Sequence, residues 1–315
     1  MKKLLLLVST LLCFLVADAS ASVKSDIRIY TAPNADAKIT TATIEAAFEG
    51  VGFSIDGNNN MNKPFSKRFG GTHYRTYHLF TVHQPDIVAK LVQKYPQIGL
   101  LTPLSMSIWS DDAKKTMKIS SLSLQGMARM TQIPANNKDL IALADLMTKA
   151  LATALPKGNF DTLNYKNTAT KDKQYATTFE TEFELEDGDE LEDLKDDFEA
   201  EFEGELEPIG FLFPGFIGLK DELEERGVND FDIYDTYSIC KLDVIYSVSK
   251  THPEVGAFAP CTYYIYKKVS EKSVHMGFPA VENWITASDI TDDASLKPLI
   301  KAQKLLEETI SELVE

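Results

Sequence analysis

The sequence predicts an α+β protein made of two tandem two-layer domains. The main evidence is an internal repeat: Tyr77–Pro103 aligns without a gap with Tyr234–Pro260, at a constant offset of 157 residues. The period is too long for a solenoid, so it predicts one domain fold used twice. Around both stretches, segments with strand and helix periodicity follow one another in the same order. The identical pairs are Tyr77 and Tyr234, Asp86 and Asp243, Pro96 and Pro253, Gly99 and Gly256, and Pro103 and Pro260.

The first domain is expected over residues 22–156, with the order strand, helix, four strands and a final long helix. A short extra helix lies between two of the strands, and Gly57–Asn60 is expected to be a loop. Antiparallel strands with helices on one face make a two-layer α+β domain. The expected strands are Asp26–Tyr30, Phe53–Asp56, Thr72–Val82, Leu104–Trp109 and a segment through Met117 and Ile119; the expected helices are Thr41–Glu49, Pro85–Tyr95 and Leu140–Leu155.

Polar residues 157–176 are the expected linker, and residues 177–315 are the expected second domain. Its first strand is expected around Phe179, and Phe211–Leu219 is strongly apolar and is expected in the core. The further expected strands are Asp232–Cys240, Cys261–Lys267 and Ser273–Gly277; the expected helices are Leu242–Lys250 and a final helix through Leu299 and Leu313.

The acidity of the chain is concentrated in one segment. Phe179–Glu207 holds sixteen Asp or Glu and one lysine, and the whole chain has a formal net charge of −15. Within this segment, residues 190–206 carry an apolar stripe at helical spacing with carboxylates elsewhere, which predicts an acidic amphipathic helix. Two interpretations stay open for it: a solvated helix docked on its own sheet, or a surface that binds a cation or a partner. The spacing of an EF-hand calcium loop is absent.

Residues 1–21 have the pattern of an export signal. Lys2 and Lys3 precede a short apolar run, and Ala19-Ser20-Ala21 is a small-residue cleavage site. The run is too short to span a membrane, and no other segment is apolar enough. We therefore expect a periplasmic or secreted protein with no membrane span in the mature chain. Nucleic acid is not an expected partner, because no basic patch is present.

The second repeat resembles a known bacterial family in its cysteine and proline positions. Ile239-Cys240, then Pro253-Glu254-Val255-Gly256, then Ala259-Pro260-Cys261 resemble the domain of unknown function 302 family, in which a cysteine commonly ends one strand and Pro-Cys begins another. The resemblance extends to both copies and is weaker in the first, where His83 and Leu104 take the cysteine positions. It implies a TATA-binding-protein-like fold, β-α-β4-α, for each copy. It implies no established activity.

Cys240 and Cys261 are the only cysteines after the signal segment. The leading interpretation is an intrachain disulfide, which requires α-carbons within about 7 Å. Two buried thiols, or a redox, metal or haem role, remain as alternatives. The sequence has no C-x-x-C and no C-x-x-C-H, so thioredoxin chemistry and covalent haem attachment lack a motif.

The other candidate site residues are aromatic side chains and histidines of the predicted sheets. Tyr237, Tyr263, His275 and His83 are the candidate lining of a pocket, and core packing is the alternative for the tyrosines. His73, His78 and His83 are evenly spaced on one predicted strand, so they cannot bind one ion together.

No motif of a hydrolase, metalloprotease or nucleotide-binding enzyme is present. The first hypothesis is an exported, non-enzymatic binding protein with an unknown small ligand or envelope protein as partner. The alternative is a thiol-based redox, metal- or haem-handling protein that uses Cys240 and Cys261. A third hypothesis is an envelope protein whose acidic helix docks a basic partner. The cofactor, the ligand and the oligomeric state are not predicted.

Overall fold

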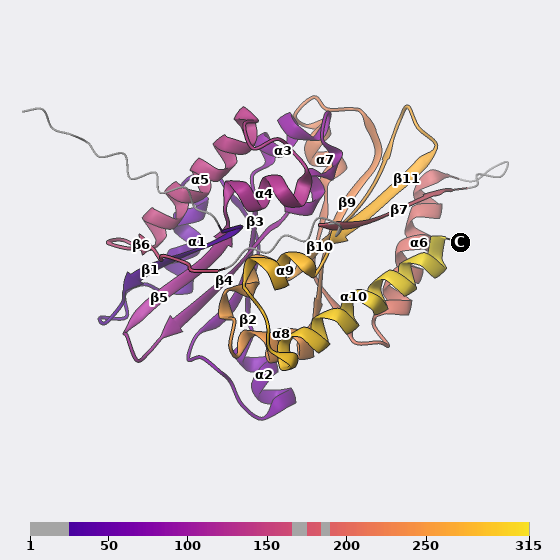
Figure 1. Cartoon of the computed structure of the whole chain (residues 1–315). Coiled ribbons are helices and arrows are strands. Elements are labelled where there is room, and N and C mark those ends of the chain that lie inside the picture. Colours follow the sequence, from indigo (N-terminus) through magenta and orange to yellow (C-terminus); the bar gives the residue numbers. More distant parts are fainter. Residues whose placement is uncertain (1–24, 166–174, 184–189, 315) are drawn as a thin grey trace, which may run out of the picture.

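The computed structural model describes residues 25–165, 175–183 and 190–314. The expected export signal at residues 1–21 lies outside this part of the chain. The first half of the chain lies on the left of Figure 1 and the second half on the right. Among the helices of the described residues, none combines the length and the hydropathy needed to cross a bilayer.

The described strands form two antiparallel sheets, which agrees with the predicted α+β class. The first sheet has the order β2-β3-β4-β5-β1-β6, and the second has the order β7-β11-β10-β9-β8. The strands of the first sheet are β1 (Ile27–Pro33), β2 (Ser54–Asn60), β3 (Tyr77–His83), β4 (Leu104–Asp111), β5 (Thr116–Leu122) and β6 (Asn159–Phe160). Those of the second are β7 (Ala176–Glu182), β8 (Phe211–Gly218), β9 (Phe231–Lys241), β10 (Cys261–Lys268) and β11 (Ser273–Pro279).

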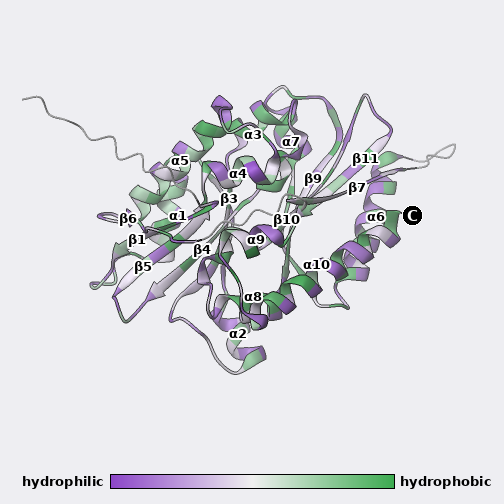
Figure 2. Cartoon of the chain, viewed as in Figure 1, coloured by the Kyte–Doolittle hydropathy of each residue, from purple (hydrophilic) through white to green (hydrophobic). Residues whose placement is uncertain are grey.

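Helices from both halves of the chain pack against the sheets. The helices of the first half are α1 (Thr41–Glu49), α2 (Asn62–Phe69), α3 (Pro85–Val92), the 3₁₀ helix η1 (Pro96–Leu101), α4 (Leu124–Thr131) and α5 (Lys138–Ala154). Those of the second half are α6 (Leu191–Leu206), α7 (Leu219–Glu224), α8 (Leu242–Ser249), the 3₁₀ helix η2 (Pro253–Ala257), α9 (Glu282–Ala287) and α10 (Asp293–Val314). Figure 2 shows hydrophobic and hydrophilic residues alternating along α6 and α10, as expected of helices with one buried face.

The register of the central strands repeats between the halves. Val82 lies opposite Leu104 in the first sheet, and Ile239 lies opposite Cys261 in the second. The pairs of β4 with β5 recur at the same offset of 157 residues in β10 with β11, for example Ile108 with Ile119 and Ile265 with Met276. Equal register fixes which face each side chain points to, because neighbouring residues of a strand alternate between faces. Positions 157 residues apart on these strands therefore point to equivalent faces of their sheets.

The two halves contact each other through reciprocal hydrogen bonds. The Tyr77 hydroxyl donates to the Pro253 carbonyl at 3.1 Å, and the Tyr234 hydroxyl donates to the Pro96 carbonyl. A second pair of bonds follows the same exchange: Ser105 Oγ donates to the Pro260 carbonyl at 2.7 Å, and Thr262 Oγ1 donates to the Pro103 carbonyl at 2.9 Å. Such an exchange of equivalent contacts is the geometry of an isologous, two-fold interface.

Glycines allow this close approach of the halves. A Cβ on Gly256 would lie 2.4 Å from the Ser107 Cβ, and one on Gly99 would lie 2.7 Å from the Tyr264 Cβ. The two contacts are again equivalent at the offset of 157 residues. Any larger residue at either glycine would force the halves apart.

Several local predictions are wrong. Gly57–Asn60 was predicted as a loop but belongs to β2, where Asn58 is held by Glu45 and His78. The predicted strand Thr72–Val82 begins only at Tyr77, so His73 lies before it. The helices α2, α4, α7 and α9 were not predicted. The apolar segment Phe211–Leu219 was expected in the core, but Leu212 and Phe216 are exposed, and only Phe211, Ile217 and Leu219 of it are buried.

Candidate functional site

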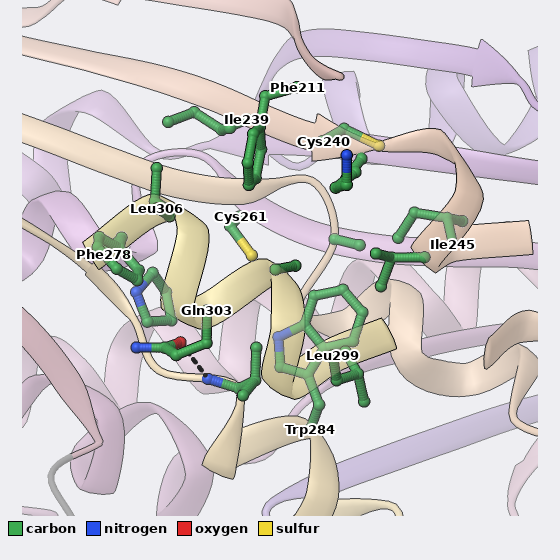
Figure 3. Close-up of a pocket in the computed structure, with 16 residues that line it drawn as sticks. Phe211, Ile239, Cys240, Ile245, Cys261, Phe278, Trp284, Leu299, Gln303 and Leu306 are labelled. Atoms are coloured by element: carbon green, nitrogen blue, oxygen red, sulfur yellow. Dashed lines mark hydrogen bonds between the residues drawn. The ribbon is translucent and has the colours of Figure 1, made fainter. Parts of the chain in front are cut away.

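Cys240 and Cys261 are free thiols, so the predicted disulfide is wrong. Cys261 lies opposite Ile239 in the ladder between β9 and β10, which places Cys240 one residue beyond its cross-strand neighbour. Adjacent residues of a strand point to opposite faces of a sheet, so the two thiols point apart. In Figure 3 the two sulfurs point in different directions.

Both thiols lie in surroundings that keep them protonated. Burial, together with the neighbouring Cys261, raises the pKa of Cys240 to about 12. Burial also raises the pKa of Cys261 to about 12, opposed in part by the Trp284 indole N–H. The thiolate is the nucleophile and metal ligand, so thiols with such pKa values are poorly suited to redox or metal chemistry at neutral pH.

A small cavity of about 40 Å³ lies between the second sheet and α10, and both Cys240 and Cys261 contribute to its lining. Figure 3 shows side chains from the sheet on one side and from α9 and α10 on the other. Most lining groups are apolar, and they include Ile239, Phe278, Leu299 and Leu306. At this volume the cavity has room for roughly three water molecules.

The cavity lies where the first half has a larger side chain. Leu104 occupies the position equivalent to Cys261, as the strand register shows, and is 3% exposed. Cysteine fills less volume than leucine, so the exchange leaves space beside the equivalent helix layer. The sequence predicted Cys261 as a site residue, but as half of a disulfide and not because its side chain is small.

Trp284 is a site residue that the sequence analysis missed. It lies on α9, its side chain lines the cavity, and it is 3% exposed. Its stacking partner is Phe258, with ring centroids 6.2 Å apart. No short motif marks this tryptophan, because its place beside Cys261 depends on how α9 folds back over the sheet.

Tyr237 and Tyr263 lie together, but they face α6 rather than this cavity. The two are directly opposite in the β9–β10 ladder, and the ring of Tyr263 stacks on Phe202 with centroids 4.5 Å apart. Glu199 of α6 lies beside them, and burial raises its pKa to about 7. These tyrosines are part of the packed layer beneath α6 and line none of the described cavities near the cysteines.

His83 and His275 do not join the tyrosines. His83 is buried, and its Nδ1 lies 2.8 Å from Asp56 Oδ1 while its Nε2 lies 3.0 Å from Glu222 Oε2. His275 Nε2 lies 2.9 Å from Glu271 Oε2 on a different part of the second sheet. The predicted pocket of four residues is therefore wrong: only Tyr237 and Tyr263 come together. Among the described residues, no cluster of three or more His, Cys, Asp or Glu could hold a metal ion.

A larger polar cleft of about 520 Å³ lies between the halves. Tyr74, Trp109 and Glu254 contribute to its lining. The Glu254 carboxylate accepts a hydrogen bond from the Tyr165 hydroxyl at 2.9 Å and lies 3.3 Å from His252 Nδ1. Lys118, also at the cleft, is paired with Asp161 at 2.9 Å. These charged groups satisfy one another, so this cleft is the weaker candidate.

Residues 29–154 match the family described as domain of unknown function DUF302. The match covers the first half, whereas the resemblance was clearest around the cysteines of the second. A crystal structure described as an uncharacterized conserved protein DUF302 from Bacillus stearothermophilus shares 17% identity with this chain, covers 45% of it and 100% of its own length, and has a TM-score of 0.37. Among curated proteins, none matches. Neither description states an activity or a ligand.

Proposed function

We propose that this chain is an exported, non-enzymatic binding protein made of two copies of one domain, with its ligand site in the second copy. The leader-like residues 1–21 support export. Five strands have the same order in both sheets, with β6 as an addition to the first, and this order, the equal register and the reciprocal hydrogen bonds between the halves support duplication. An isologous interface within one chain is expected when a symmetric dimer is fused into a single polypeptide.

The observation that carries the binding proposal is the cavity at Cys261. Cores are normally packed without voids larger than a water molecule, and an unfilled cavity lowers stability. The first half shows that the fold accepts leucine at this position, Leu104. The smaller residue and the apolar cavity of about 40 Å³ in the second copy support a site for a very small apolar ligand there.

The alternative, a redox or metal function of the two cysteines, has less support. The thiols point to opposite faces of the sheet, and the pKa of each is raised to about 12. A resolving pair must be able to reach disulfide geometry, and a metal ligand must lose its proton. Neither requirement fits this arrangement.

Two substitutions at Cys261 separate a cavity from a reactive thiol. Cys261→Leu fills the space with the residue of the first half, whereas Cys261→Ala removes the thiol and enlarges the space. We expect small uncharged organic compounds to raise the melting temperature of the wild type and of Cys261→Ala, but not of Cys261→Leu. Native mass spectrometry with the same compounds checks the stoichiometry of one ligand per chain.

Loss of binding in Cys261→Leu must not result from unfolding. Filling about 40 Å³ should stabilise the protein by on the order of 1 kcal/mol if leucine is accepted as it is in the first half. Equal responses of wild type and Cys261→Leu to every compound would contradict the proposal. Loss of binding in Cys261→Ala would instead favour the thiol alternative.

A further inference from the structure

A polar cavity of about 430 Å³ belongs to the first half of the chain. It lies between the loop that precedes α1, the start of β3 and the β4–β5 hairpin. Hydroxyl groups, an imidazole and three charged side chains contribute to its lining. The volume is within the range of sites for small organic molecules and leaves room for one the size of a monosaccharide.

The second half has carboxylates at two positions equivalent to lining residues. The strand ladders place His78 and Asp235 at equivalent points of β3 and β9. The offset of 157 residues likewise pairs Arg75 with Asp232. Two acidic side chains of the second half therefore correspond to an arginine and an imidazole in the first.

Each of these carboxylates has a counter-ion within the second half. Lys195 of α6 lies 3.4 Å from Asp235, and Lys267 of β10 pairs with Asp232. The first half has neither lysine: α1 has 9 residues and α6 has 16, so α6 begins about two turns earlier, and Ser110 takes the position of Lys267. The cavity of the first half thus lies where the second half has its ion pairs.

Two cations at the cavity lack a counter-ion from the protein. Arg75 and Lys115 contribute to the lining, and neither forms an ion pair with another of the described residues. Asp112 is the acidic residue of the lining, so the charged groups there sum to one positive charge. A guanidinium recognises a carboxylate well, because it can donate two parallel hydrogen bonds to it.

The imidazole of His78 offers an acceptor. Its Nδ1 lies 2.6 Å from Asn58 Oδ1, and the amide nitrogen of Asn58 donates to Glu45 at 2.9 Å. Because Asn58 Oδ1 can only accept, Nδ1 of His78 carries the proton. Burial lowers the pKa of His78, so the ring is neutral at neutral pH and Nε2 is unprotonated. Such a nitrogen accepts a hydrogen bond from a hydroxyl group.

We infer that this cavity binds a small hydroxylated carboxylic acid of the sugar-acid class. The carboxylate pairs with Arg75, Lys115 adds attraction, and a ligand hydroxyl donates to His78 Nε2. A monoanion balances the positive charge of the lining, and further hydroxyls suit its serine and threonine side chains. This site goes beyond the proposed function, because it is separate from the cavity at Cys261.

D-Glucuronate and its uncharged isostere D-glucuronamide test this chemistry in the full-length protein by isothermal titration calorimetry. We expect saturable binding of one glucuronate per chain, weakened by added salt. The amide should bind about tenfold more weakly, because it lacks the charge that Arg75 recognises. Acetate, which has the carboxylate without the hydroxyls, should bind more weakly by a similar factor.

Arg75→Gln removes the charge and keeps a polar side chain. We expect this variant to bind glucuronate as weakly as the wild type binds the amide. Arg68→Gln is the matched control, because Arg68 is an exposed arginine of α2 that does not line the cavity. Arg75→Asp combined with Ser110→Lys installs the ion pair of the second half and should abolish binding.

Equal affinities of the wild type for glucuronate and glucuronamide, equal effects of Arg75→Gln and Arg68→Gln, or no saturable binding of glucuronate would overturn the inference. Tighter binding of acetate or inorganic phosphate than of glucuronate would overturn the assignment to a hydroxylated acid. Cys261→Leu should bind glucuronate as the wild type does, so a failure at this site and a failure of the proposed function are seen separately.

Discussion

His83 lies between two carboxylates that belong to different halves of the chain. Asp56 is on β2 and Glu222 is on α7 of the second half, so the histidine joins the halves. Burial alone would lower the pKa of His83, but the hydrogen bonds and charges of Asp56 and Glu222 outweigh it and raise the pKa to about 9. The imidazolium is therefore the charged centre of a cluster at the interface.

This pKa predicts an alkaline loss of stability. The folded pKa of His83 lies above the ordinary value of 6.5, so its contribution is fully present below pH 6.5 and is lost as the pH rises through 9. The difference between the pKa of His83 in the folded protein and its ordinary value corresponds to a contribution of about 3 kcal/mol at most to the free energy of unfolding. We expect His83→Gln to reduce stability at pH 6 and to remove this part of the alkaline decline, as measured by urea unfolding at a series of pH values.

His275→Gln is the matched control, because His275 also pairs with a carboxylate but is partly exposed and lies away from the interface. Its alkaline decline should equal that of the wild type. An NMR titration of the His83 ring protons with a midpoint near pH 6.5 would contradict the assignment.

For individual residues, the sequence identified Cys261 as a candidate but did not reveal its role. A cysteine pair in a chain expected to be exported suggests a disulfide, and only the strand register reveals that Cys240 and Cys261 point apart. Trp284 could not be predicted, because its indole reaches the cavity through tertiary packing and no periodicity in the sequence encodes that contact.

The acidic helix α6 is anchored by one lysine. Lys195 Nζ lies 2.7 Å from Glu192 and 3.4 Å from Asp235, which is on β9 and 5% exposed. Asp235 is therefore a buried carboxylate whose nearest cation comes from the helix. A solvated helix docked on its own sheet, one of the two sequence-based interpretations, fits this arrangement.

Lys195→Met should destabilise the protein by about 3 kcal/mol, because it leaves Asp235 buried without its cation. Lys195→Met combined with Asp235→Asn should recover most of the loss, since both charges are then absent. Lys304→Met is the control: Lys304 pairs with Glu308 at the surface, and its removal should change stability by less than about 1 kcal/mol. Equal losses for Lys195→Met and Lys304→Met in denaturant titrations would contradict the anchoring role.

At the element scale, apolar periodicity predicted the helices and strands whose buried faces are regular. The part of β2 with Gly57, Asn58 and Asn59 was missed because its residues have the composition of a turn. Its backbone pairs with β3, and the Asn58 side chain bonds to Glu45 and His78. Such pairing with distant groups cannot be recognised in a short window of sequence.

The interface between the halves has a further consequence for the whole molecule. Two pairs of hydrogen bonds between the halves recur at an offset of 157 residues, so this part of the first half's surface carries both the donors and the acceptors of these bonds. Ser105 is a donor and the Pro103 carbonyl is an acceptor in this surface, and each bonds to its counterpart from the second half. Tyr77 and the Pro96 carbonyl form a second such set. The surface is therefore close to complementary to itself.

We expect residues 25–165 expressed alone to form a symmetric dimer in which a second copy takes the place of the missing half. Tyr77 would donate to the Pro96 carbonyl of the other copy, and Gly99 would lie against Ser107 across the two-fold axis. Glu222 would be absent, so His83 would keep only Asp56 as its partner and the alkaline decline of the dimer should begin at a lower pH.

Light scattering coupled to size-exclusion chromatography measures the mass of residues 25–165 in solution. Gly99→Val, which places a branched side chain at the point of closest approach, should weaken the dimer strongly, whereas Gly71→Val, at a position with open space around it, should not. A well-folded monomer at micromolar concentration would show that the reciprocal bonds depend on differences between the halves, above all on His83 and Glu222, rather than on their equivalence.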